Sequence, residues 1–281
     1  MKKIIKINCY TLKELKSSIN KKNVIVGILL GLVISAKQAV CYLKFVNGHT
    51  VNIFESFMLC FSRQGYALII LIGSLLTCID APFINERSFF LVHRLGRHEW
   101  YKSSWRYIIF INLIYYLLIV LLCSLIFLNR GYYQDEWSQT ILRVMRGYNS
   151  RMDIYEIFPP SINLTEFSPF VSFIFTFIDA YLYSVLLTSV VFVFNMLSLN
   201  KALGLITIGL FHTVSYLITI ENAFLPVFLN KISMYRNAFF PIGYDKTVAS
   251  PDFSIIFFVL LIYIIYIIGE KVVTRIDFYV R

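Results

Sequence analysis

The stretch that decides the fold is residues 107–128, YIIFINLIYYLLIVLLCSLIFL, which contains no charged side chain. A helix needs about 20 mostly apolar residues to cross the hydrocarbon core of a membrane. Comparable apolar runs occur at 24–43, 66–83, 169–199, 202–220 and 253–269. These runs do not alternate as the strands of a membrane barrel do, and helices satisfy their own backbone groups in lipid. The sequence therefore predicts an all-α polytopic membrane protein with six transmembrane helices, forming a single transmembrane domain over residues 1–281.

The overall composition agrees with a membrane protein and argues against a nucleic-acid partner. The chain is 58% hydrophobic and only 15% charged, with a mean hydropathy of +0.70, whereas soluble domains carry about 25% charged residues. Its net charge of +10 is unevenly distributed. Sixteen of the 26 Lys and Arg residues lie in segments 1–23, 84–106, 200–201 and 270–281. Because cytoplasmic loops are enriched in Lys and Arg, this bias predicts that both termini are cytoplasmic.

Catalytic and cofactor motifs are missing from the sequence. It contains no Gly-x-x-x-x-Gly-Lys-Ser/Thr phosphate loop, no His-Glu-x-x-His motif and no Gly-x-Ser-x-Gly motif. The five cysteines are dispersed without paired spacing, which favours packing roles over disulfides or a metal site. We therefore expect a chain without its own catalytic site, bound cofactor or metal.

The first 23 residues are typical of an interfacial helix on the cytoplasmic side. Thr11 and Glu14 have the spacing of a helix-capping box, and Leu12, Leu15 and Ile19 share one helical face. The intervening lysines would face anionic head groups. A solvated basic tail is the alternative.

Residues 84–106 form a basic and aromatic segment between the second and third predicted spans, and Gly96 divides it. Residues Glu86 to Leu95 are predicted to form a short cytoplasmic helix with Gly96 at its C-terminal end. A second helix restarts at Arg97 and continues into the third span, with aromatic residues where a membrane interface is expected. The segment is either a docking helix for a protein partner or a plain interfacial loop.

The outer loops at 129–168 and 221–252 contain apolar pieces that are too short to span a membrane. In the first loop, helical spacing relates Trp137, Ile141 and Met145. We expect re-entrant or surface-lying helices in both loops.

Four ionisable residues fall inside the predicted spans, where an unpaired charge costs several kcal/mol. Asp179 lies deep in the fourth span, so it needs a buried partner or a wet cavity, and we expect it to line a translocation path. Asp80 is expected to have a structural role, either capping the next turn or pairing with Arg87 or Arg94. Lys37 is expected to extend to the head groups, and His212 to be a satisfied core histidine.

The layout and two local sequences resemble a known family. The local sequences are Asp80-Ala-Pro-Phe and the later Phe89-Phe-Leu-Val-His-Arg-Leu-Gly. Together with six spans, an amphipathic N-terminal helix and an apolar segment between the last two spans, they resemble the permease subunits of bacterial type-2 ATP-binding cassette exporters. The resemblance covers nearly the whole chain in layout, but its motifs are diffuse.

The resemblance implies a multi-pass protein of the bacterial cell membrane that exports an amphiphilic substrate such as a peptide, a lipid-like molecule or a drug. A separate ATPase subunit, which binds ATP and Mg²⁺, would dock on the helix matching Glu86–Leu95, and a second permease would complete the pathway. The residues implied in docking are Glu86, Arg87, Phe89, Phe90, His93, Arg94 and Arg97. The alternative is an integral membrane protein that acts by binding alone, such as an immunity or sensor subunit. A membrane-embedded hydrolase is disfavoured because no His, Glu or Cys cluster is visible.

Overall fold

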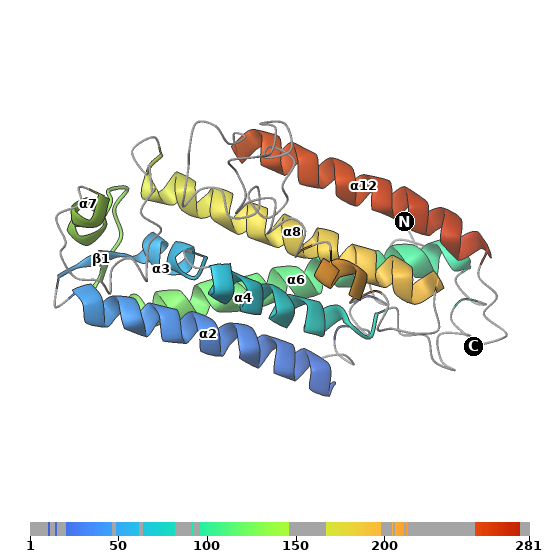
Figure 1. Ribbon diagram of the computed structural model, residues 1–281, viewed down its shortest axis with the longest axis horizontal. Helices are drawn as coiled ribbons and strands as arrows, with labels where there is room; N and C mark the ends of the chain where they lie inside the picture. The colour runs from blue at the N-terminus through green and yellow to red at the C-terminus, as the bar shows by residue number, and fades with distance from the viewer. Residues whose placement is uncertain are drawn as a thin grey trace.

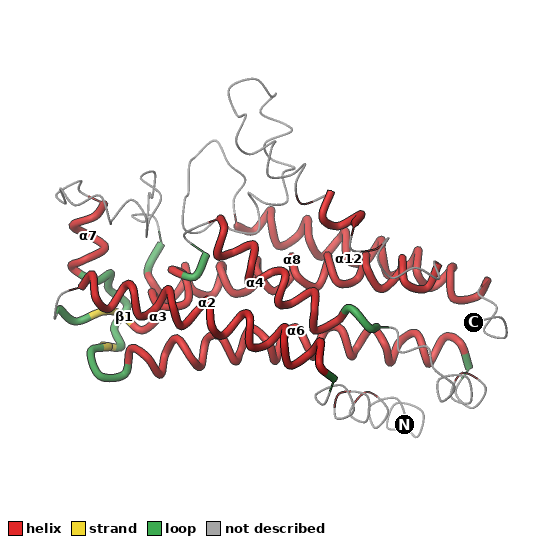
Figure 2. The backbone as a smooth tube through the Cα atoms, turned by 60° about the horizontal axis from the view of Figure 1, so that its bottom comes forward, coloured by secondary structure: helices red, strands yellow, loops and turns green. Residues whose placement is uncertain are grey.

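The computed structural model is a bundle of helices aligned along one long axis (Figures 1 and 2). It describes residues 21–46, 49–61, 64–81, 96–145, 167–197 and 251–275, together with residues 11, 15, 92, 204, 206–210 and 212. The elements are α2 (Lys22–Val46), β1 (Val51–Asn52), α3 (Ile53–Leu59), α4 (Gln64–Cys78), α6 (Arg97–Phe127), β2 (Gly131–Tyr132), α7 (Gln139–Met145), α8 (Pro169–Leu197) and α12 (Pro251–Arg275).

Four of these helices, α2, α6, α8 and α12, are long and apolar enough to cross a membrane. They contain the runs from which the first, third, fourth and sixth spans were predicted, although α8 ends at Leu197 and α6 begins at Arg97. The predicted fifth span, 202–220, lies largely outside the described residues, and residues 206–210 within it are helical. The structure thus supports a mostly helical, membrane-spanning protein, and the number of six spans stays a prediction.

The two ends of the bundle contain different elements, and we call them the strand end and the Gly96 end. At the strand end, β1 and β2 pair in parallel, with Val51 opposite Gly131 and Asn52 opposite Tyr132. The short helices α3 and α7 lie at the same end (Figure 1). At the Gly96 end, α6 begins and α8 and α12 finish (Figure 1). The charge bias of the sequence predicts that the Gly96 end is cytoplasmic.

The predicted second span is interrupted. Helix α4 ends at Cys78, whereas the apolar run continues to Phe83. Its 15 residues extend only about 22 Å at 1.5 Å per residue, less than the hydrocarbon thickness of about 30 Å. Helix α3 precedes it at the strand end, and nearly all of α3 is buried.

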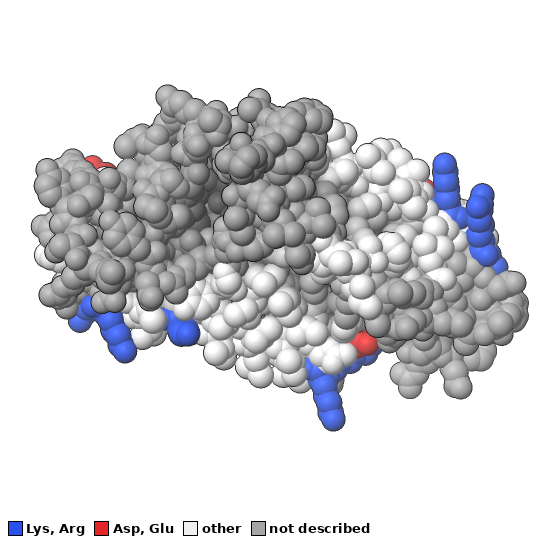
Figure 3. All heavy atoms as spheres, viewed as in Figure 1, with Lys and Arg blue, Asp and Glu red and all other residues white. Residues whose placement is uncertain are grey.

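The interior of the bundle is apolar and aromatic, and its apolar surface is extensive. Helix α12 is the least embedded of the four long helices, and many of its large apolar side chains are exposed: Phe253, Ile256, Val259, Leu260, Tyr263, Ile264, Ile267 and Ile268. On the face shown in Figure 3, the described Lys and Arg side chains are few and are separated by uncharged described surface. This distribution is the one expected for a helix bundle in lipid.

Two smaller elements, the N-terminal segment and α7, can be compared with their predictions. In the N-terminal segment, Thr11 and Leu15 are helical and buried, and the Thr11 hydroxyl lies 3.3 Å from that of Ser103 in α6. Helix α7 falls in the first outer loop, as helical spacing there predicted. The strand pair was not predicted.

Candidate functional site

The first candidate site is the beginning of α6, which follows directly on the segment predicted to dock an ATPase. Gly96 has a positive φ of 86°, a conformation that side chains other than glycine rarely adopt. Its N–H donates to Val92 O at 2.8 Å, and its carbonyl accepts from Trp100 N at 3.1 Å. Gly96 is therefore the N-cap residue of α6. Val92 before it is helical, and the rest of the predicted helix from Glu86 to Leu95 lies outside the described residues.

Of the predicted docking residues, the structure describes only Arg97. The others, Glu86, Arg87, Phe89, Phe90, His93 and Arg94, lie outside the described residues. Arg97 donates from Nη1 to the carbonyl of Thr274 at 2.7 Å. Next to it, His98 Nδ1 lies 3.2 Å from Glu270 Oε1. These contacts join the start of α6 to the last turns of α12.

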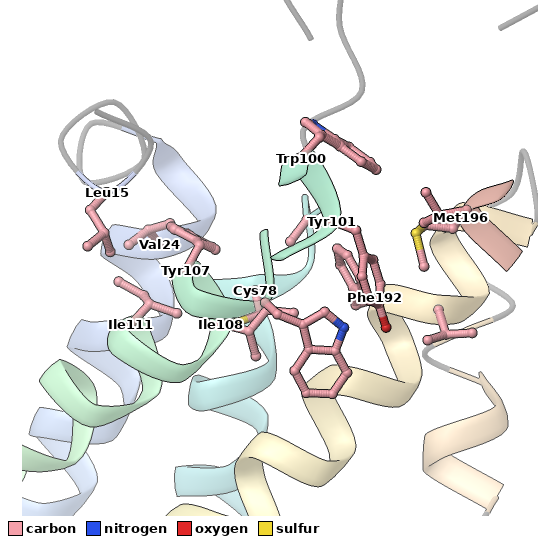
Figure 4. Close-up of a cluster of buried hydrophobic side chains, with 14 residues drawn as sticks. Leu15, Val24, Cys78, Trp100, Tyr101, Tyr107, Ile108, Ile111, Phe192 and Met196 are labelled. Carbon is pink, nitrogen blue, oxygen red and sulfur yellow. The ribbon is translucent and has the colours of Figure 1, made fainter. Parts of the chain in front are cut away.

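An aromatic cluster fixes the first turns of α6 against α8 and α12 (Figure 4). The Tyr101 hydroxyl donates to the carbonyl of Tyr266 at 2.7 Å. The ring of Trp105 packs edge-on against Phe192 of α8 and Tyr266 of α12, with centroid distances of 6.3 and 5.3 Å. Gly269 leaves the space that the Tyr101 hydroxyl occupies, since a Cβ there would clash with it. We call Tyr101, Trp105, Phe192, Tyr266 and Gly269 the aromatic clamp.

The end of α4 is held by side chains from two other helices. Asn195 of α8 donates from Nδ2 to the carbonyls of Ile79 and Ala81, at 3.1 and 2.8 Å. Asn23 of α2 donates from Nδ2 to Asp80 Oδ2 at 2.9 Å. Asp80 therefore has Asn23 as a partner that the sequence did not identify. Its predicted partners Arg87 and Arg94 lie outside the described residues.

A polar network crosses the middle of the bundle. Ser74 of α4 donates to Asn112 Oδ1 at 2.7 Å, and Asn112 Nδ2 donates to Thr188 Oγ1 at 3.1 Å. Nearby, the hydroxyls of Tyr116 and Ser184 lie 2.6 Å apart. These buried groups tie α4 and α6 to α8. Asn112, as a polar residue within the run 107–128, was the signal in the sequence that could have indicated this network.

Asp179 differs from Asp80, the other acidic residue of the predicted spans, in its lack of hydrogen-bond partners among the described residues. It lies on α8 and is 0% exposed. Neither of its carboxyl oxygens has a hydrogen-bond partner within the part of the chain that the structure describes. On the same helical face, the Thr176 hydroxyl donates to Ser172 O at 2.8 Å. Ser172 Oγ is itself buried, and no described residue offers it a hydrogen bond.

The other two intramembrane candidates have identifiable contacts. His212 Nδ1 lies 2.8 Å from the hydroxyl of Tyr183, so it is a satisfied core histidine as expected. Lys37 is exposed, and its Nζ lies 5.4 Å from the centroid of the Tyr66 ring. A cation over an aromatic face is a favourable contact. The structure brings neither Lys37 nor His212 into hydrogen-bond contact with Asp179.

Sequence reasoning missed a second buried carboxyl group, Glu55 of α3. Its Oε1 accepts from Ser138 N at 2.7 Å, and its Oε2 accepts from the Tyr42 hydroxyl at 3.3 Å. Burial raises the pKa of Glu55 from 4.5 to about 7, although the donated hydrogen bonds act in the opposite direction. The signal in the sequence was an acidic residue inside the apolar run 51–61.

The residues around Glu55 connect α3 to the segment that follows β2 at the strand end. Asn52 caps α3 by accepting from Phe54 N at 3.0 Å. Its Nδ2 donates to the carbonyls of Gln134 and Glu136, at 2.6 and 2.9 Å. Burial raises the pKa of Tyr132 to about 12, so its phenol stays neutral at ordinary pH. Glu55 and Asn52 together fasten the segment after β2 to α3.

The residues that the structure describes do not form a metal site. No group of three His, Cys, Asp or Glu side chains there is arranged to hold a metal ion. Comparison with known proteins adds no identification, because no family model, curated protein or solved structure matches the chain.

Proposed function

We propose that this chain is the membrane-spanning permease subunit of an ATP-binding cassette exporter. It would form the path for an amphiphilic substrate and be driven by a separate ATPase subunit that binds ATP and Mg²⁺. A second permease, identical or related, would complete the path. The proposal draws on the resemblance in layout and on the missing phosphate loop, which leaves ATP hydrolysis to another polypeptide.

The observation that carries the proposal is the attachment of α6 at the Gly96 end. A partner that moves the segment before Gly96 would act directly on the first turn of α6. The aromatic clamp would pass that movement to α8, which contains Asp179, and to α12. Packed aromatic side chains transmit displacement because protein interiors are nearly incompressible. A protein that acts by binding alone has no need of such a connection.

The test is reconstitution with an ATPase subunit encoded near this chain. We expect the two proteins to co-purify, and substrate export in proteoliposomes to require ATP. Reversing a charge in the docking segment, Arg94→Glu, should weaken ATPase binding by about tenfold or more, since Arg residues are frequent hot spots. Membrane insertion should stay intact.

The matched control is Arg275→Glu, which reverses an exposed charge at the same end of the bundle, in α12. It should leave ATPase binding within about twofold of the unmodified protein, as expected for a charge outside the contact. Unchanged coupled transport in Arg94→Glu would contradict the docking role. Failure of any such ATPase to co-purify would favour the binding-only alternative.

A further inference from the structure

We infer that Asp179 anchors a binding site for an organic cation, a ligand that carries an ammonium or similar cationic group on an apolar body. This inference deepens the proposed export function, on which it rests, by naming the class of substrate. Three features of α8 and its neighbours support it: the unpartnered carboxyl group, the aromatic rings beside it and the shortage of other oxygen ligands.

The carboxyl group of Asp179 lacks the partners that a structural carboxyl normally has. It is 0% exposed, and both oxygens are without a hydrogen bond in the described part of the chain. No other charged residue occurs between Pro169 and Leu197. Buried ionisable groups in membrane helices are rare and mark the paths of ions or substrates. Asp179 therefore has unused capacity to accept hydrogen bonds and to pair with a positive charge.

Aromatic side chains lie one helical turn from Asp179 in both directions, at Phe175 and Tyr183. The Tyr183 ring packs against Phe258 of α12 and against His212, with centroid distances of 5.7 and 6.0 Å. Aromatic faces attract cations, especially where water is excluded. An apolar cation that pairs with a carboxylate and contacts aromatic side chains one turn away matches this chemistry better than an anion or a sugar does.

An inorganic cation is a poorer occupant. Calcium takes six to eight oxygen ligands and magnesium needs six in octahedral geometry. Among the residues that the structure describes, no group of three His, Cys, Asp or Glu side chains is arranged to hold a metal ion. One carboxylate with few oxygen neighbours can pair with an ammonium group, which needs fewer and less regular contacts.

The position of α12 offers a way to reach the site. Tyr183, on the same face of α8 as Asp179, contacts α12 through Phe258. Helix α12 is the least embedded of the long helices and is joined to α6 by the aromatic clamp. Separation of α12 from α8 would open the face of α8 that carries Tyr183 and Asp179, and the arrangement seen here would then be the closed state.

The experiment measures binding of tetraphenylphosphonium to the full chain in lipid nanodiscs, without any ATPase, by equilibrium dialysis against empty nanodiscs. We expect saturable binding at one site per chain. Asp179→Asn should weaken it by about tenfold or more, because the attraction between the carboxylate and the phosphonium charge is lost. The control Asp252→Asn, which neutralises an exposed acid in the first turn of α12, should retain the affinity.

Two results would overturn the inference: no saturable binding above empty nanodiscs, or equal affinity in Asp179→Asn. A variant that does not fold is covered by a second measurement on the unmodified chain. Dicyclohexylcarbodiimide reacts with buried carboxyl groups in membranes, and saturating tetraphenylphosphonium should suppress its addition to Asp179, as followed by mass spectrometry. Undiminished labelling would mark Asp179 as a buried acid that takes no cation.

The two proposals fail separately. Cation binding without a co-purifying ATPase would support the site and remove the exporter. ATP-coupled transport that is unaffected by Asp179→Asn would support the exporter and remove the cation site.

Discussion

Two buried carboxyl groups, Glu55 and Asp179, differ in what surrounds them. Both are 0% exposed. Glu55 accepts hydrogen bonds from Ser138 N and the Tyr42 hydroxyl, whereas Asp179 accepts none in the described part of the chain. A buried polar group that is hydrogen-bonded contributes to the fold, and one that is not costs stability. The comparison assigns Glu55 to architecture and leaves Asp179 available for a ligand.

Removing the two carboxyl groups should therefore have unequal effects on stability, and this is the largest difference we expect. Glu55→Ala leaves Ser138 N–H and the Tyr42 hydroxyl without the carboxylate acceptor. The Tyr42 hydroxyl still lies 3.3 Å from Ser138 Oγ, so only the Ser138 N–H is orphaned. At about 1–3 kcal/mol for that group and about 1 kcal/mol for the other lost hydrogen bond, the free energy of unfolding should fall by about 3 kcal/mol. The measurement is unfolding in bicelles driven by sodium dodecyl sulfate.

Asp179→Ala is the matched variant, since it also truncates a buried acid. It removes no hydrogen bond of the described structure, so its free energy of unfolding should stay within about 1 kcal/mol of the parent protein. Equal losses in the two variants would show that Asp179 has a structural partner and would break the comparison.

The contrast was only half visible in the sequence. Asp179 was conspicuous because it is the one charged residue in a long apolar run that was predicted to form a transmembrane helix. Glu55 did not stand out because its partners are distant in the chain, at Tyr42 and Ser138. Hydrogen bonds between remote residues leave no local pattern, so nothing in the sequence indicated that this carboxyl between two predicted spans is buried.

The free energy of unfolding should also depend on pH through Glu55, and this effect should be smaller than that of Glu55→Ala. Burial raises the pKa of Glu55 from 4.5 to about 7. Because the folded pKa exceeds the unfolded one, the stabilisation is complete below about pH 4.5 and is lost as the pH rises through 7. Between pH 5 and pH 8 the free energy of unfolding should fall by roughly 2 kcal/mol.

The pH series is measured in the Asp179→Asn background, which removes the second buried carboxyl group. Tyr132, beside Glu55, stays neutral over this range because burial raises its pKa to about 12. Adding Glu55→Gln should flatten the profile. A slope that persists in the double variant would assign the pH dependence to another group.

The helices were easier to predict than their interruptions, for a physical reason. Length and apolarity alone require a helix at residues 107–128. The end of α4 at Cys78 depends instead on Asn195, whose amide satisfies the carbonyls of Ile79 and Ala81. That side chain comes from α8, more than a hundred residues later, so no local pattern marks the interruption.

The smallest effect is expected at the aromatic clamp, where a single hydrogen bond is involved. Tyr101→Phe removes the donor to Tyr266 O and keeps the ring contacts, so it should cost about 1 kcal/mol. Gly269→Ala should cost more, because its methyl group would clash with the Tyr101 hydroxyl.

Combining the two changes tests the clamp itself. Without the hydroxyl, the methyl group of Gly269→Ala loses its severest clash and keeps tight contacts of 3.1 Å with two ring carbons. The double variant should therefore be more stable than the sum of the single losses predicts. Coupling of about 1 kcal/mol in this cycle would show that α6 and α12 meet at these atoms. Strict additivity would mean that α12 is not held there, and a movement of the segment before Gly96 would then reach Asp179 only through α8.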